Sequence, residues 1–108
     1  MIVDYRAYVL QTGSVGDFLN LFETTGLPIQ KKILGNFIAM FRQEFGNPNE
    51  IIHLWGYENI ADRELRRAKC AADPDFQAYV KEARKYIVSQ NVRLLVPTPS
   101  TPSLMNLV

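Results

Sequence analysis

The sequence predicts an α+β fold in which a four-stranded antiparallel sheet carries its helices on one face. Two observations support this prediction. Strand-like alternation and helical periodicity succeed one another in the order β-α-β-β-α-β, and a Gly-Asn-Pro-Asn turn (46–49) joins the two middle strands as a hairpin. This order is the ferredoxin-like arrangement. The 108 residues contain no dividing linker, so we expect one domain, residues 1–108.

The N-terminal third of the chain predicts one strand and two helices. Residues 2–10 alternate between two side-chain sets, as a strand does. Ser14 stands at the position of a helix N-cap, and apolar residues at helical spacing follow it. Gly26 is expected to stop this first helix. A second helix then begins at Pro28, which suits a first helical position, and ends at Gly35.

The middle of the chain predicts the central hairpin. Residues 36–45 have helical propensity, but Phe37, Ala39 and Phe41 alternate and a turn follows, which favours a strand. Residues 50–58 form the next strand.

The C-terminal part predicts helices, one strand and a tail. Asn59 can cap one helix, and Asp73 before a proline can cap another whose apolar stripe extends to Ile87. Residues 92–96 are expected to be the last strand. The Pro-rich segment 97–108 cannot continue a helix or a central strand and is expected to be an extended tail.

Apolarity assigns the two faces of the sheet. The more apolar set is expected to face the helices: Val3, Tyr5, Ala7, Val9, Ile52, Leu54, Gly56, Val92, Leu94 and Val96. The opposite face then carries Arg6, Tyr8, His53, Trp55, Tyr57, Arg93 and Leu95. Left in water, this second face would be a large exposed patch, so we expect a homodimer packed sheet to sheet around an enclosed space.

That enclosed space predicts a ligand site. Its candidate ligand-binding residues are Arg6, Tyr8, His53, Trp55, Tyr57 and Arg93. His53 is the candidate catalytic residue, because an ordinary histidine pKa near 6.5 suits a general base. The alternative for His53 is a structural hydrogen bond, and the alternative for Trp55 and Tyr57 is packing.

The two arginines of this set allow two readings. A buried arginine must be paired, and Asp4 or Glu44 could pair with it. Otherwise the planar guanidinium groups could hold the carboxylate of an organic acid.

Other chemistries find no support in the residue pattern. The glycines form no phosphate-binding loop, and a single histidine lacks the usual ligand set of zinc, so no cofactor and no metal are expected. Cys70 is the only cysteine and reads as a reduced thiol packed on a helix. A formal charge of +1 does not favour nucleic acid, and the arginine-rich run 63–69 reads as a solvated face. No apolar run is long enough for a membrane span and no signal peptide is visible, so a cytoplasmic location is expected.

Several segments together resemble the NIPSNAP family, in register from about Tyr5 to Pro99. They are LPIQKKILG (27–35), IHLWGY (52–57), ADRE (61–64), DPDFQAY (73–79), SQNVR (89–93) and PTP (97–99). The resemblance implies a dimeric α+β barrel. The family includes mitochondrial proteins of animals, some implicated in vesicle-related processes and in marking damaged mitochondria for autophagy, and small bacterial proteins. This chain looks like the bacterial, single-domain type.

The resemblance brings no established set of catalytic residues. The wider superfamily of dimeric α+β barrels contains cofactor-free monooxygenases and haem-degrading enzymes, whose substrates are expected in the cavity on the open sheet face. Three hypotheses therefore stay open: a module that binds a small organic molecule, a cofactor-free monooxygenase, and a non-enzymatic interaction or scaffold dimer.

Overall fold

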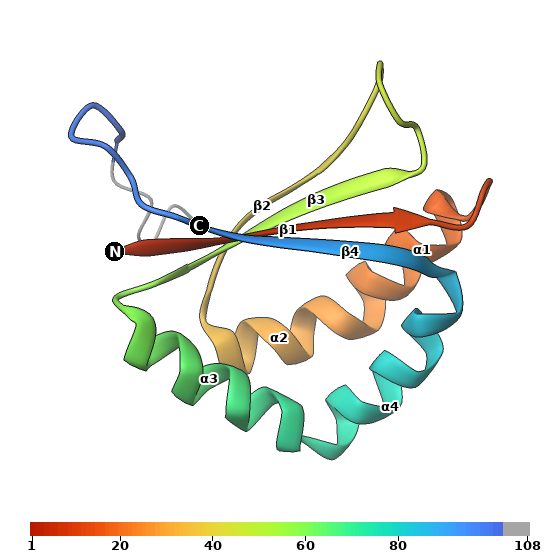
Figure 1. Ribbon diagram of the computed structural model, residues 1–108. Helices are drawn as coiled ribbons and strands as arrows, with labels where there is room; N and C mark the ends of the chain where they lie inside the picture. Colours follow the sequence, from red (N-terminus) through yellow and green to blue (C-terminus); the bar gives the residue numbers. More distant parts are fainter. Residues whose placement is uncertain (103–108) are drawn as a thin grey trace.

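The computed structural model describes residues 1–102 and shows a four-stranded antiparallel sheet with its helices on one face (Figure 1). The strands are β1 (Ile2–Leu10), β2 (Asn36–Arg42), β3 (Glu50–Tyr57) and β4 (Ile87–Leu95), in the spatial order β2-β3-β1-β4. The helices are α1 (Val15–Leu21), α2 (Leu27–Leu34), α3 (Ile60–Ala72) and α4 (Pro74–Ala83). The predicted α+β, ferredoxin-like order is confirmed within the chain.

Two predicted strand boundaries are wrong. The strand expected over residues 36–45 ends at Arg42, and the last strand begins at Ile87 rather than at residue 92. Ile87, expected on the apolar stripe of a helix, opens β4 after a 3₁₀ turn (Arg84–Tyr86). The reason is that β4 pairs with β1 along its length, from Leu10 opposite Ile87 to Val3 opposite Leu95. Main-chain hydrogen bonds thus hold a strand whose first half lacks an apolar pattern.

The expected break at Gly26 is also wrong. A π-helical turn (Phe22–Gly26) joins α1 to α2, and Gly26 has right-handed helical angles, φ −69° and ψ −46°. Glycine is needed here for space, because a Cβ atom at this position would collide with the ring of Tyr79 on α4. π-turns of this kind often lie at functional sites.

The N-caps of the later helices are confirmed. The Asn59 side chain accepts a hydrogen bond from the Asp62 amide at 2.8 Å, and the Asp73 side chain accepts one from the Phe76 amide at 2.9 Å. Ser14 differs, because its hydroxyl donates to the Gln11 carbonyl at 2.6 Å and makes no cap hydrogen bond.

The assignment of sheet faces is wrong for β1 and β3. Ile51, Trp55 and Tyr57 belong to the core formed with the helices, where Phe18 and Leu34 join them. The register places Asp4 opposite Trp55, Arg6 opposite His53 and Tyr8 opposite Ile51, so these β1 residues share that face. We call it the inner face.

The outer face, which no helix covers, holds the residues that were expected inside. In the register these are Val3, Tyr5, Ala7 and Val9 of β1 and Ile52, Leu54 and Gly56 of β3. Ala39 and Phe41 of β2 lie on the same face. On β4 the assignment by apolarity holds, since Arg93 and Leu95 pair with Tyr5 and Val3 on the outer face. Arg93 is thereby separated from the other candidate ligand-binding residues.

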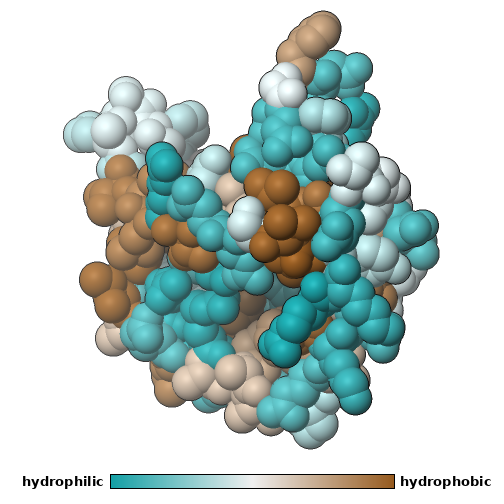
Figure 2. Space-filling view, turned by 45° about the vertical axis from the view of Figure 1, so that its right-hand side comes forward, coloured by the Kyte–Doolittle hydropathy of each residue, from teal (hydrophilic) through white to brown (hydrophobic). Residues whose placement is uncertain are grey.

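Two segments project from the sheet (Figure 1). The loop between β2 and β3 carries Phe45, whose side chain is 93% exposed. The tail leaves β4 on the side away from the helices, and residues 96–102 include a turn in which the Thr101 amide donates to the Thr98 carbonyl. The tail is therefore not uniformly extended, and residues 103–108 of it lie outside the described residues. Hydrophobic side chains reach the surface in several patches (Figure 2).

Candidate functional site

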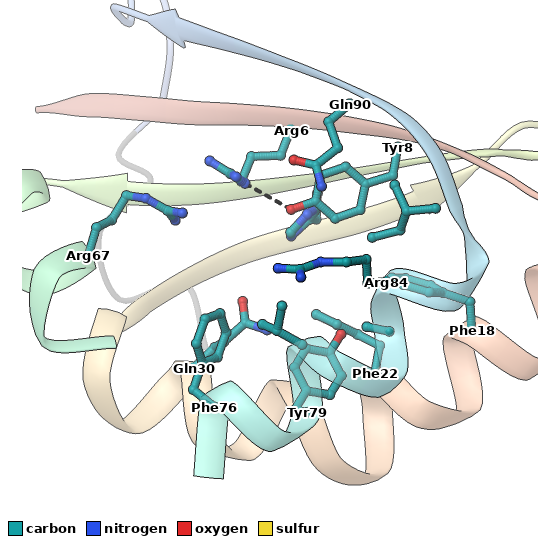
Figure 3. A pocket seen from close by; sticks show the side chains of 14 residues that line it. Arg6, Tyr8, Phe18, Phe22, Gln30, Arg67, Phe76, Tyr79, Arg84 and Gln90 are labelled. Carbon is teal, nitrogen blue, oxygen red and sulfur yellow. Dashed lines mark hydrogen bonds between the residues drawn. The ribbon is translucent and has the colours of Figure 1, made fainter. Parts of the chain in front are cut away.

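A cavity of about 230 Å³ lies inside the chain, between the inner face of the sheet and the helices. Arg6, Tyr8 and His53 form its sheet wall, while α1, the π-turn, α2, α3 and α4 supply the other walls (Figure 3). Arg84 and Gln90 also line it and are exposed, so the cavity opens to solvent between the end of α4 and β4.

His53 is the most constrained polar group of the cavity. It lies on the central strand β3 with 3% of its surface exposed. The indole nitrogen of Trp55 lies 2.9 Å from His53 Nδ1. Because an indole N–H can only donate, Nδ1 must accept, and neutral His53 then carries its proton on Nε2. Within residues 1–102, Nε2 has no hydrogen-bond partner.

Burial and, after it, the nearby guanidinium groups of Arg6 and Arg67 together lower the pKa of His53 to about 3. The ordinary value near 6.5, on which the general-base hypothesis depended, does not apply. His53 is neutral at physiological pH and is a poor base. Its chemistry is that of a fixed hydrogen-bond donor, held edge-on to Tyr8 at a centroid distance of 4.9 Å.

Arg6 is buried and paired with Asp4. Arg6 Nη1 lies 3.3 Å from Asp4 Oδ2, and Arg6 Nε donates to the Tyr8 hydroxyl at 3.1 Å. Asp4 is fully buried and also accepts from Arg63 Nε at 3.1 Å. Burial disfavours the charged form of Arg6, but the interactions with Tyr8 and Asp4 favour that form more strongly, so the pKa of Arg6 is raised. Of the two pairings expected for a buried arginine, the structure has Asp4, while Glu44 pairs with Arg42 on the surface.

Two further arginines reach the cavity, and the sequence pattern did not indicate either as a site residue. Arg67 extends from α3 and Arg84 from the end of α4, with their guanidinium groups pointing into the cavity from opposite sides (Figure 3). Arg67 was expected on a solvated face, but it is half-buried. The amphipathic pattern of α3 could have indicated it, since Arg67 lies three residues before the buried Cys70.

The helix side of the cavity is apolar and aromatic. Phe18 and Phe22 stack with ring centroids 6.5 Å apart, and Phe76 packs beside Tyr79 at 6.1 Å. The π-turn sets this wall, because Gly26 leaves the space that the Tyr79 ring fills. Burial raises the pKa of Tyr79, so its hydroxyl stays protonated. Gln30 of α2 adds a buried amide.

The predicted site residues thus divide into three groups. Arg6, Tyr8 and His53 line one cavity, but on the inner face and within one chain, not on a wall between two sheets. Trp55 and Tyr57 are each 1% exposed and lie in the core, with Trp55 beside His53 on the same face of β3. Burial raises the pKa of Tyr57. Arg93 is exposed on the outer face and does not reach the cavity.

Other chemistry finds no support in the described part of the chain. No group of three or more metal-binding side chains occurs within residues 1–102. Cys70 is buried and burial raises the pKa of its thiol, which agrees with the expected packed, reduced cysteine. None of the helices in that range has the length and apolarity that crossing a bilayer requires.

The chain matches a protein-family model over most of its length. The NIPSNAP family model matches residues 3–102. The human protein NipSnap homolog 3A is 37% identical over 65 residues, which are 60% of this chain and 26% of that protein. A NipSnap homolog of Dictyostelium discoideum is 30% identical over 87% of this chain and 41% of its own length. The chain therefore spans between a quarter and two fifths of these curated relatives.

Solved structures agree with this match. A NIPSNAP family protein of Agrobacterium tumefaciens superposes with a TM-score of 0.90 at 37% identity, covering 93% of this chain and 88% of that one. A NIPSNAP-like domain protein of Burkholderia xenovorans gives 0.92 at 36% identity, covering 95% and 90%. An antibiotic biosynthesis monooxygenase gives 0.66 at 14% identity over 92% of this chain and all of that one, which shows a shared fold alone.

Proposed function

The chain belongs to the NIPSNAP family, and from that premise we propose that this domain binds a small organic molecule in the cavity between its sheet and its helices. The observation that carries the proposal is the unpartnered Nε2–H of His53 in the cavity wall. A buried donor without a partner costs about 1–3 kcal/mol. An acceptor atom on a ligand would offset that cost, and the aromatic wall would cover the rest of the molecule.

Native mass spectrometry of the freshly purified protein tests this proposal. We expect a discrete extra mass on each chain, lost on denaturation. Val80→Phe places a larger side chain in the cavity wall and should remove the extra mass. Ala78→Phe is the matched control, because Ala78 is exposed on the same helix and does not line the cavity. A bare chain, or equal retention in both variants, would argue against the proposal.

A homodimer is a second part of the proposal. Its support is the outer face of the sheet, which no helix covers although apolar side chains line it. Packing against the same face of a second copy would remove that surface from water and close the arrangement around a twofold axis. In this dimer the outer faces form the interface and each chain keeps its own cavity.

The monooxygenase alternative is less well supported than binding. Cofactor-free oxygenation requires a base that removes a proton from the substrate, and His53, whose pKa is lowered to about 3, is a weak base. The arginines are donors and not bases. Oxygen consumption on addition of a substrate, lost in His53→Gln, would restore this alternative. The cytoplasmic location stays a prediction that cell fractionation would test.

A further inference from the structure

The cavity is chemically asymmetric, and this asymmetry points to a ligand class. This ligand class rests on the proposed function, since it specifies the kind of molecule that the cavity takes. The arginines and His53 come from the sheet, α3 and the end of α4. The α1–π-turn side and α4 contribute aromatic rings, and the Gln30 amide and the Tyr79 hydroxyl are the polar groups among them (Figure 3).

The charges in the cavity are unbalanced. Arg6, Arg67 and Arg84 line it, and no carboxylate does so among the described residues. Asp4 pairs with Arg6 and also with Arg63, which has Glu64 as a second partner, so this carboxylate leaves no charge for Arg67 or Arg84. Within residues 1–102, Arg67 and Arg84 make no ion pair. An anion is therefore the complement of this cavity.

The arginines and His53 offer donors, which a ligand with acceptor atoms would bind. The guanidinium groups can only donate, and His53 also offers a donor because Trp55 occupies its Nδ1. A carboxylate has two oxygens that accept several hydrogen bonds in a plane, which matches a guanidinium group. Phosphate fits less well, because the chain has no glycine-rich loop of the kind that holds phosphate groups.

The remaining volume fits an aromatic body. An apolar cavity of about 150 Å³ in another protein binds benzene, and this cavity has about 230 Å³. There is thus room for a ring system and an acid group. Phe18, Phe22 and Phe76 offer ring faces and edges against which a planar body packs.

We propose that the cavity binds an aromatic carboxylate, with its carboxylate between Arg67 and Arg84, within reach of the His53 Nε2–H, and its ring against the phenylalanine wall. The bound anion supplies the negative charge that the cavity lacks. Arg6 remains paired with Asp4 and completes the positive surroundings.

Calorimetry with three probes tests this proposal on dialysed protein that native mass spectrometry shows to be bare. The probes are 2-naphthoate, its neutral isostere 2-naphthamide, and 2-naphthyl phosphate. We expect 2-naphthoate to bind at least about tenfold more tightly than the other two, as charge-assisted hydrogen bonds predict. Tighter binding of the amide or the phosphate would overturn the proposal.

Variants locate the acid group. Arg84→Gln and Arg67→Gln should each weaken 2-naphthoate about tenfold or more and leave 2-naphthamide unchanged. Arg93→Gln is the control, an arginine on the outer face, and should change neither affinity. Equal losses for the acid and the amide, or a loss in Arg93→Gln, would overturn the assignment.

The single tryptophan gives an independent readout of position. Trp55 donates its indole N–H to His53, so a ligand that accepts from His53 Nε2–H should shift the one indole N–H signal in the NMR spectrum. Binding without that shift would place the probe elsewhere and overturn the proposal. Failure of the carboxylate proposal can be distinguished from failure of the proposed function. A retained mass that disappears in Val80→Phe would support the cavity as a binding site. A preference for the neutral probe in the same protein would then exclude the carboxylate alone.

Discussion

The two faces of the sheet reverse the usual distribution of polar and apolar residues. The inner face, under the helices, buries Asp4, Arg6 and His53. The outer face, which no helix covers, presents Tyr5, Leu54 and their apolar neighbours. A cluster of apolar residues indicates a surface that is removed from water, but the cluster alone does not tell whether this surface belongs to the core or to an interface. A buried charged or polar group needs a partner, and on the inner face some of these groups line a cavity that could supply one through a ligand.

In this sheet, polarity within the core, rather than apolarity, locates the site. The inner face retains an ion pair and a histidine donor, although hydrophobic residues at these positions would have a smaller desolvation cost. Such groups are expected where a ligand is bound.

Removing the buried carboxylate should have the largest effect. Asp4→Asn leaves Arg6 buried without its counter-charge, and we expect a loss of roughly 3–5 kcal/mol in the free energy of unfolding. Urea unfolding followed by Trp55 fluorescence measures this loss. Glu44→Gln is the control, because its pair with Arg42 is on the surface and is worth about 0–1 kcal/mol. Similar losses in both variants would contradict the reading of the inner face.

Acidification should destabilise the wild-type protein through His53. The folded pKa is lowered to about 3, while the unfolded chain binds this proton near pH 6.5. Between these values the unfolded state carries more protons, so stability falls as the pH falls, by up to about 1.4 kcal/mol per pH unit from this group. His53→Gln should flatten the slope between pH 6.5 and 4.5. Identical slopes in the two proteins would contradict a neutral, buried His53.

A charge on the outer face should separate the proposed dimer without unfolding the chain. Leu54 is half-buried on the central strand β3, and Leu54→Lys should raise the dimer dissociation constant about 30-fold or more, as at an interface hot spot. Sedimentation velocity measures the effect. Leu65→Lys, on the exposed side of α3, should leave it unchanged. A wild-type protein that sediments as a monomer would refute the dimer.

Deleting residues 98–108 should have the smallest effect. The tail leaves β4 beside the outer face, so we expect it to touch the partner and its loss to weaken the dimer by less than about tenfold. The same sedimentation experiment applies. An unchanged dissociation constant would show that the tail takes no part.

Much of the fold could be predicted because local signals agree with it. Alternation in β1 and β3, the hairpin turn and the caps at Asn59 and Asp73 all depend on nearby residues, and the structure contains each element. Boundaries that depend on tertiary pairing were missed: Ile87 joins β4 because β1 lies beside it, and Gly26 is explained only by the Tyr79 ring.

The site could be predicted in part. Arg6, Tyr8 and His53 share a face by the two-residue period of strands, and this grouping holds. Which face they share could not be read from apolarity, because the outer face is apolar too. Arg67 and Arg84 come from helices that approach the sheet only in the folded chain, so no sequence spacing relates them to His53.

In the proposed arrangement the cavity belongs to one chain, while the outer face joins two chains. Native mass spectrometry of Leu54→Lys beside the wild-type protein tests this arrangement. We expect a wild-type dimer with one retained small molecule per chain, and a variant monomer that still carries its molecule. Loss of the small molecule together with the partner would contradict this arrangement, because the site would then require both sheets.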